Sequence, residues 1–312
     1  MNAVDLAIIM FLLMIVGFIS RKTKIVDENF GKSLSVFIFN IVFPAIVINS
    51  MSISFDKNDL HNSIMLILIS IGTMIIMFII GKITNLVTKK SDSLSRIITF
   101  AMMFPNFTFM AFPIMETLFP DKGLFYISMY TIPTRFAIYV LGPLLIKPKD
   151  EGDSRMKALK DGLKALLTPP VLAIPIGLLL YFTGISLPLP IHETIAHFAR
   201  IATPMGMVVS GIMLAEASFK SLLGESRLYL LIALRLVVAP VLIYFILLPL
   251  NLDPVILKIS VIYCALPIAS STTIFALQYK GDASSASGGV LLTTVFSMIT
   301  VPICAYILEV VV

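Results

Sequence analysis

Long apolar runs separated by short polar connections make up most of this chain. Each run is near the roughly 20 apolar residues that a helix needs to cross a bilayer. The runs are continuous rather than alternating, which excludes a membrane β-barrel. We therefore expect an all-α integral membrane protein with ten transmembrane helices. The expected spans are approximately 4–20, 33–53, 63–86, 96–118, 123–146, 163–184, 193–215, 227–249, 254–278 and 285–309.

A polar segment at 147–162 divides the expected spans into five plus five. Because five is odd, the second half would enter the membrane upside down relative to the first. Proline and glycine also recur at a nearly constant spacing between the halves, as Gly17 with Gly177, Pro44 with Pro204, Pro105 with Pro267, and Pro143 with Pro302. The pattern predicts an inverted repeat. Its parts would be a first repeat at 1–146, a cytoplasmic linker at 147–162 and a second repeat at 163–312.

Two of the expected spans are interrupted by proline at matching places, Pro105 in the fourth span and Pro267 in the ninth. A proline inside a helix removes a backbone hydrogen bond and clashes with the preceding turn. Hydrocarbon cannot satisfy the freed carbonyls, so such a break has to be buried in protein or line a cavity. We expect the two breaks to meet near the membrane midplane. Half-helix N-termini there would attract an anion, and C-terminal carbonyls a cation.

Composition and charge agree with a membrane protein. The chain is 58% hydrophobic and 13% charged, whereas a soluble domain is about 25% charged. Of its 23 Lys and Arg residues, 17 fall in connections or near span ends on one side of the expected spans, three on the other side and three deeper within spans. The positive-inside rule then puts both termini outside and the central linker in the cytoplasm. This orientation also explains the net charge of +5 without nucleic acid.

The sequence carries no recognisable enzyme motif. A Walker loop, a nucleophile elbow and a His-Glu-x-x-His motif are all missing from it. Transport would therefore run on gradients rather than on ATP. Cys264 and Cys304 are expected to be apolar core residues, and neither a metal site nor a cofactor is predicted.

Polar residues beside the two breaks are the candidate substrate contacts. Asn106 comes first because its amide can donate to a carboxylate, and the same side chain is also suited to capping a half-helix. The hydroxyls of the 270–273 run would line the site or bond back to helix carbonyls. The expected substrate-binding set is Asn106, Pro105, Thr108, Pro267, Ser270, Ser271, Thr272, Asn49 and Arg135.

Charged residues within spans are functional candidates by default. Arg135, beside Pro133, would neutralise an anionic substrate or pair structurally with Glu116. Glu116 is the candidate proton carrier, and Thr273 is a candidate ligand for a coupling cation. Arg200 and Arg235 are expected to snorkel to an interface or to pair structurally.

The order and spacing of these motifs resemble the auxin efflux carrier family over nearly the whole chain. That family comprises plant carriers and their bacterial relatives and is related to the bile acid/sodium symporter-like superfamily. The residues that carry the resemblance are the segment 39–45, Pro105-Asn106 with Pro113, Thr168-Pro169-Pro170 with Gly177, Pro204 and Gly211, and Ala265-Leu266-Pro267 with Phe275, Ala276 and Tyr279. The short central loop is typical of a bacterial member.

The resemblance implies helices that cross at the prolines of spans four and nine, and an elevator-like movement. Spans one, two, six and seven would form a scaffold, and spans three to five and eight to ten would form the moving domain. A homodimer through the scaffold is also suggested by the resemblance. Val47, Ile268 and Glu116 stand where plant carriers have serine, glutamine and lysine, so a smaller, more polar anion fits as well as auxin.

We therefore expect a secondary transporter in the cell membrane. Its cargo would be a small organic anion, such as malate, malonate or an auxin-like acid, and its partners would be membrane lipids rather than nucleic acid. Proton symport, sodium symport and uniport all remain open. The alternatives are a membrane receptor or scaffold that keeps the transporter fold, and an anion channel. An intramembrane enzyme is disfavoured for lack of catalytic residues.

Overall fold

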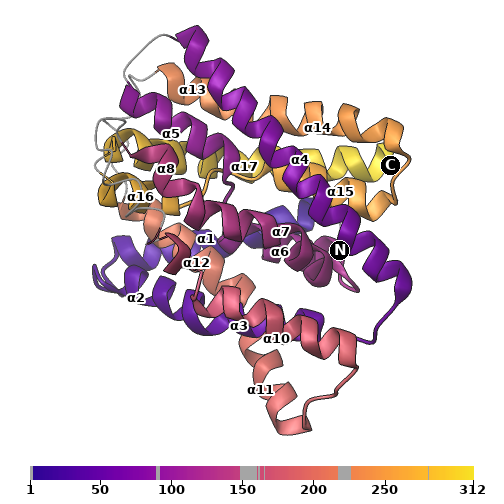
Figure 1. Cartoon of the computed structure of the whole chain (residues 1–312). Helices are drawn as coiled ribbons and strands as arrows, with labels where there is room; N and C mark the ends of the chain where they lie inside the picture. Colours follow the sequence, from indigo (N-terminus) through magenta and orange to yellow (C-terminus); the bar gives the residue numbers. More distant parts are fainter. Residues whose placement is uncertain are drawn as a thin grey trace. The chain divides into compact units, whose positions relative to one another are not determined.

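The computed structural model describes residues 3–88, 92–147, 160, 162–164, 166–216, 226–279 and 281–312. These residues are helical apart from turns and connections (Figure 1), and extended pairing among them is limited to one antiparallel bridge between Pro105 and Ile268. The expected all-α class is therefore confirmed. Of the predicted linker at 147–162, residues 148–159 and 161 lie outside the described residues.

The helices form two compact units, each assembled from three separate stretches of the chain. The first unit comprises Met1–Ile67, Thr108–Ile132 and Leu167–Glu216, and the second comprises Leu68–Phe107, Pro133–Leu166 and Ala217–Val312. Three elements contribute residues to both units, namely α4 (Lys57–Thr88), the π-turn η2 (Phe107–Ala111) and α7 (Gly123–Val140).

The first unit otherwise consists of α1 (Ala3–Lys22), α2 (Phe30–Phe37), η1 (Ile38–Val42), α3 (Phe43–Met51), α6 (Phe112–Leu118), α10 (Pro169–Thr183), α11 (Leu189–Arg200) and α12 (Ala202–Glu216). Within it, α1 packs along α12, and α3 packs against both α10 and α11. The ring of Phe43 lies 6.1 Å from that of Phe109 and 5.7 Å from that of Phe112. Aromatic packing therefore contributes to the core of this unit.

The second unit otherwise consists of α5 (Asp92–Met103), α8 (Gly142–Ile146), α13 (Ser226–Ala233), η3 (Leu234–Val238), α14 (Ala239–Leu247), η4 (Leu248–Leu250), α15 (Pro254–Ala265), α16 (Ser271–Gln278) and α17 (Ala283–Val311). The long helix α17 is central to it and packs against α13, α15 and α16. Phe100 contacts Phe104 and Phe275 with ring centroids 4.8 Å and 5.3 Å apart.

Three π-turns share one cause in the sequence. Each of them, η1, η2 and η3, ends two residues before a proline, namely Pro44, Pro113 and Pro240. Proline has no N–H for the usual helical bond, and its ring clashes with the carbonyl four residues earlier. The turn before it widens to relieve that clash, and such widened turns are frequent at functional sites. The prolines therefore fix where side chains of these helices change direction.

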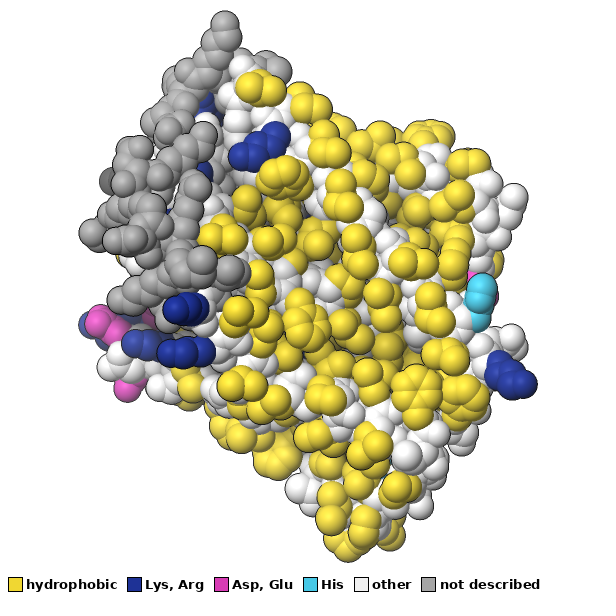
Figure 2. All heavy atoms as spheres, viewed as in Figure 1, with side chains coloured by type: hydrophobic (Ala, Val, Ile, Leu, Met, Phe, Trp, Pro, Cys, Tyr) yellow, Lys and Arg dark blue, Asp and Glu magenta, His cyan; other side chains and the backbone are white. Residues whose placement is uncertain are grey.

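Several helices are long and apolar enough to cross a bilayer. Within the described residues these are Phe30–Met51, Lys57–Leu86, Leu189–Glu216, Arg227–Leu250 and Ala283–Val311, with shorter apolar helices at Ser93–Met103, Phe107–Leu118, Pro169–Thr183 and Pro254–Ala265. Exposed aliphatic side chains form a stripe along α4, at Ile64, Leu68, Ile71, Ile75, Ile79 and Ile83. Hydrophobic side chains cover most of the face in Figure 2. Such surfaces suit contact with lipid. The count of ten spans stays a prediction.

Helix α4 begins at Lys57, earlier than the expected start of the third span at 63. The polar residues at its start are ordered by a buried carboxylate. Asp59 is 2% exposed and accepts hydrogen bonds from Lys122 Nζ at 2.7 and 2.8 Å and from Tyr126 Oη at 2.7 Å. The hydrogen bond to Asp59 raises the pKa of Lys122 above its ordinary value. A long-range ion pair therefore stabilises a segment whose composition is typical of a loop.

Candidate functional site

Both expected helix breaks are present in the second unit. Helix α5 ends at Met103 and η2 begins at Phe107, so residues 104–106 are non-helical. Helix α15 ends at Ala265 and α16 begins at Ser271. Leu266, just before Pro267, is extended, with φ −65° and ψ 149°, the conformation that a following proline favours. The prediction of broken helices at Pro105 and Pro267 is therefore confirmed.

The two breaks cross and pair with each other through their main chains. The Asn106 N–H donates to Pro267 O at 2.7 Å, and the Ala269 N–H donates to Phe104 O at 2.9 Å. These bonds form the antiparallel bridge between Pro105 and Ile268. Each break thereby supplies hydrogen-bond partners for main-chain N–H and C=O groups that have none within their own helix. Main-chain groups buried in an apolar environment need such partners.

Several side chains at the crossing are polar, and two of these, Asn106 and Thr272, are buried. Asn106 is 3% exposed, and its Nδ2 donates a long hydrogen bond of 3.4 Å to Ser270 Oγ. Thr272, in the first turn of α16, is fully buried, and its hydroxyl has no hydrogen-bond partner. Ser271 and Thr273 beside it are half-buried. The structure therefore brings Asn106 and Ser270 into contact at the junction of Pro105 and Pro267.

Helix α17 packs against the second break and hydrogen-bonds to its main chain. Thr293 Oγ1 accepts a hydrogen bond of 3.3 Å from the Ile268 N–H and donates one of 2.7 Å to Gly289 O. A Cβ atom on Gly289 would come within 3.0 Å of Ile268 Cδ1. Gly289 thus lets α17 approach the break closely, and the Thr293 hydroxyl, one helical turn later, holds the backbone of Ile268.

Among the described residues of this unit, the side chains of Arg135, Arg227 and Arg235 are buried. Arg135 of α7 is 3% exposed, and its guanidinium carbon lies 5.4 Å from the centre of the Phe107 ring. Arg235 of η3 is 1% exposed and donates from Nε to Leu266 O at 3.0 Å and from Nη1 to Met102 O at 2.6 Å. Of the two expectations for Arg235, snorkelling to an interface is wrong, and the structural role is confirmed in a different form, because two main-chain carbonyls hold the side chain in the interior.

The remaining predicted residues belong to the first unit. Thr108, in η2, and Asn49, in α3, are half-buried. Glu116 of α6 accepts a hydrogen bond of 2.6 Å from Thr203 Oγ1. The Glu116 carboxylate therefore has a hydrogen-bond donor within its own unit. The pairing of Glu116 with Arg135 stays a prediction.

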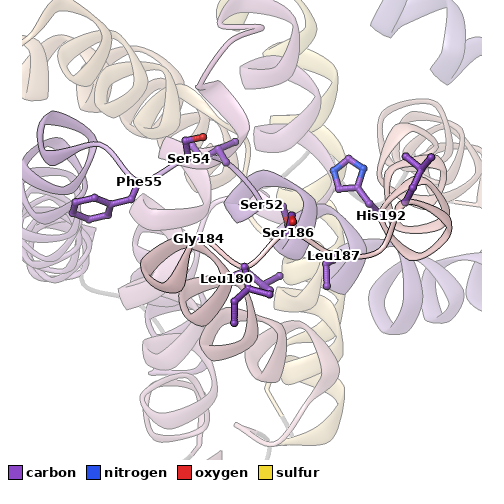
Figure 3. Close-up of a pocket in the computed structure, with 11 residues that line it drawn as sticks. Ser52, Ser54, Phe55, Leu180, Gly184, Ser186, Leu187 and His192 are labelled. Carbon is purple, nitrogen blue, oxygen red and sulfur yellow. The ribbon is translucent and has the colours of Figure 1, made fainter.

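A separate cavity of about 430 Å³ lies in the first unit. Figure 3 shows that Ser52, Ser54 and Phe55 come from the connection after α3, that Leu180, Gly184, Ser186 and Leu187 come from α10 and the connection after it, and that His192 comes from α11. Ser52 Oγ already donates to Ile48 O at 2.7 Å. The lining contains none of the predicted site residues, so this cavity adds nothing to the predicted set.

Sequence reasoning missed two interactions. The role of Arg235 depends on carbonyls, which every residue has, so residue types alone gave no signal for its partners. The nearby Pro240 was the available clue, because a proline widens the turn before it and η3 holds the arginine. The ion pair of Asp59 with Lys122 joins residues far apart in the sequence, and neither lies in an expected span.

Comparison with known proteins extends over nearly the whole chain. A family model described as membrane transport protein matches residues 3–305. An "Uncharacterized transporter" of Methanothermobacter thermautotrophicus is 22% identical over 313 residues, which cover 99% of each chain. A "Putative malonate transporter" of Rhizobium meliloti is 29% identical over 145 residues, 45% of this chain and 44% of the relative. A "Probable auxin efflux carrier component 9" of Oryza sativa subsp. japonica is 28% identical over 132 residues, 42% of this chain and 31% of the relative.

Proposed function

Because this chain belongs to the membrane transport protein family, we propose that it is a secondary transporter of a small organic anion. The family and the transporter names of its relatives make it a multi-pass membrane transporter of a small molecule, and not an enzyme. The anionic cargo, the mechanism and the coupling are the proposed part.

The crossing of the two helix breaks is the observation that carries the proposal. The first turn of α16 begins directly after the second break, and N–H groups at a helix start have no helical acceptor and carry partial positive charge. Asn106 adds a buried amide donor, and Thr272 adds a buried hydroxyl without a partner. A carboxylate is a suitable acceptor for such donors. Arg135 contributes positive charge to the same unit.

For the cargo we propose a mono- or dicarboxylate such as malonate or malate, with an auxin-like acid as the other candidate. The names of the Rhizobium meliloti and Oryza sativa relatives agree with these two classes. Ile268 is an apolar residue within the second break, so recognition there would rest on the first turn of α16 and on Asn106. We also propose that the cargo contacts Thr108, Asn49, Ser270 and Ser271.

For the mechanism we propose elevator-type alternating access with ten spans in two inverted repeats. Spans one, two, six and seven would form the scaffold, and their helices α1, α3, α10 and α12 all belong to the first unit. Parts of α4 and α7 belong to that unit too, so the boundary of the moving part would run within helices. Both termini would lie outside and the central linker in the cytoplasm. A homodimer through the scaffold is part of the same proposal.

Coupling has three candidate forms. A proton would use Glu116, sodium would use carbonyls and hydroxyls near the second break with Thr273 among them, and uniport would use neither. Uptake of labelled malonate into proteoliposomes, measured with and without a proton or sodium gradient, distinguishes the three.

Labelled uptake in proteoliposomes also tests the cargo, with malonate, malate and indole acetate compared. We expect at least one carboxylate to accumulate in the wild-type protein, and Asn106→Ala to lower its initial uptake rate about tenfold or more. Asn58→Ala is the matched control, because Asn58 is exposed at the start of α4. Unchanged uptake by Asn106→Ala would show that Asn106 is not the central binding residue. Currents far above carrier turnover would favour a channel instead.

A further inference from the structure

Arg235 joins the ends of two helices that are far apart in the sequence. We infer that this guanidinium takes the place of a bound metal cation where the two breaks cross. Anion transport would then need no sodium ion bound to the carbonyls there. The inference rests on the proposed function, because it specifies the coupling of the same site. Arg235 is a positioning residue in this reading, since it holds the breaks rather than the cargo.

The two carbonyls that accept from Arg235 stand at the C-terminal ends of two half-helices. Met102 is the residue before the last one of α5, and Leu266 directly follows the last residue of α15. Carbonyls in the final turn of a helix have no helical donor and carry partial negative charge. One positive group therefore neutralises two negative helix ends, which is the task that a coupling sodium performs at broken helices in other transporters.

Three other carbonyls of the crossing are already hydrogen-bonded as well. Phe104 O accepts from the Ala269 N–H, Pro267 O from the Asn106 N–H at 2.7 Å, and Pro105 O from the Phe107 N–H at 2.8 Å. A metal ion would have to compete with these donors for its oxygen ligands. These three carbonyls are thus occupied by the protein's own N–H groups.

Arginine suits this position better than lysine does. Its planar fork donates from two separate nitrogens, Nε and Nη1, to two carbonyls on different helices, whereas a lysine ammonium acts as a compact point charge. Arginine also stays protonated in proteins, so the positive charge is permanent. The π-turn η3, which Pro240 follows, sets the direction of this side chain.

The arrangement divides the crossing by charge. The C-terminal ends receive a fixed cation from within the chain, and the partial positive charge at the N-terminal start of α16 would attract a mobile anion. Sodium would therefore be neither a ligand of the crossing nor a driver of uptake. A proton carried elsewhere, for example by Glu116, is compatible with this division.

The first test needs only the wild-type protein. Initial uptake of labelled malonate into proteoliposomes, and thermal unfolding in detergent, are compared in sodium chloride and in choline chloride of equal ionic strength. We expect both quantities to be unchanged. Sodium-dependent uptake, or stabilisation by sodium but not by choline, overturns the inference while leaving an anion transporter in place.

Variants test the arginine itself, with Arg200→Gln as the control because Arg200 is exposed at the end of α11. Arg235→Ala orphans two buried carbonyls, each worth roughly a tenfold change in an equilibrium constant. We expect uptake to fall about tenfold or more, and millimolar guanidinium to restore part of the unfolding temperature and of the uptake. Equal tetramethylammonium should restore neither.

Arg235→Lys keeps the charge but not the fork, and it provides a second variant if the alanine form is too unstable to purify. We expect this variant to fold, with an unfolding temperature between those of the wild type and Arg235→Ala. Sodium should not change that temperature. Wild-type stability in Arg235→Ala, or rescue by sodium as strong as by guanidinium, overturns the inference. The unfolding measurements do not depend on malonate being the cargo, so a failure to take up malonate counts against the proposed function alone.

Discussion

Gly17 of α1 and Gly211 of α12 each lie directly against the backbone of the opposite helix. A Cβ atom on Gly17 would overlap the carbonyl oxygen of Val208, and one on Gly211 would overlap that of Met14. Lipid is as apolar as leucine, so helices in a bilayer associate largely through close packing of small residues. The two glycines therefore set the separation of α1 and α12.

Replacing one of these glycines should push the helices apart. We expect Gly17→Ala to lower the free energy of unfolding by about 1–3 kcal/mol, the usual cost of overpacking. Thermal unfolding in detergent measures this change. Gly72→Ala in α4 is the control, because nothing lies within 4 Å of its added Cβ and alanine is the better helix former. A transition in Gly17→Ala equal to that of the wild type would argue against the close contact.

The unpartnered hydroxyl of Thr272 allows binding to be separated from stability. Valine has nearly the same shape, so Thr272→Val removes a buried polar group that has no partner, and stability should stay equal or rise. If the hydroxyl contacts the cargo, the KM for malonate uptake should rise about tenfold, or ~1.4 kcal/mol.

Thr300→Val is the matched control for this substitution, because the Thr300 hydroxyl in α17 is likewise buried without a partner. It should share the effect on stability and leave the KM unchanged. Equal KM values in all three proteins would exclude Thr272 from the binding site.

The ion pair at the start of α4 gives a stability that depends on pH. The pKa of Lys122 is raised by its hydrogen bond to Asp59, so the pair contributes below the ordinary lysine pKa and is lost as pH rises through the raised value. Asp59→Asn should cost about 1 kcal/mol at neutral pH, the low end of the roughly 1–3 kcal/mol expected when a buried hydrogen-bonded group loses its partner. The low end applies because the lysine is 44% exposed and solvent screens its charge.

Unfolding temperatures of the wild type and of Asp59→Asn, compared at neutral pH and at about pH 11, check this prediction. The difference between the two proteins should shrink at the higher pH. A difference that is constant over that range would mean that the charge of Lys122 does not stabilise the fold.

Pro240 should control the direction of Arg235. With alanine in its place an N–H becomes available, and the π-turn η3 can revert to an α-helical turn. This change rotates the helix on one side of the turn, so Pro240→Ala should reduce malonate uptake severalfold while the protein stays folded. Pro302→Ala in α17 is the control, since that proline lies inside a continuous α-helix. Equal uptake by both variants would separate the π-turn from function.

The sequence predicted the features that depend on proline and on long apolar runs. Both breaks, at Pro105 and at Pro267, follow from a missing N–H and a steric clash that no neighbouring residue can remove. The all-α membrane class follows equally directly from the length of the apolar runs. The contact between Asn106 and Ser270 was expected only in general terms, as residues flanking two breaks that meet.

Contacts with main-chain carbonyls could not be predicted. Met102 O and Leu266 O bind Arg235 because the helices end there, and the side chains of Met102 and Leu266 carry no information about it. The buried Asp59 was also beyond reach, because its polar neighbours in the sequence are typical of a loop and its partners come from α7 and the connection before it. The assignment of the site residues to a cargo stays a prediction.

The joint between the two breaks is made by peptide groups, which every amino acid supplies. Replacing Asn106, Ile268 or Ser270 removes side chains but leaves the two main-chain bonds of the bridge available. If these side chains contact the cargo as proposed, selectivity can be redesigned residue by residue, towards larger, smaller or differently charged metabolites, while the main-chain framework of the two breaks is kept.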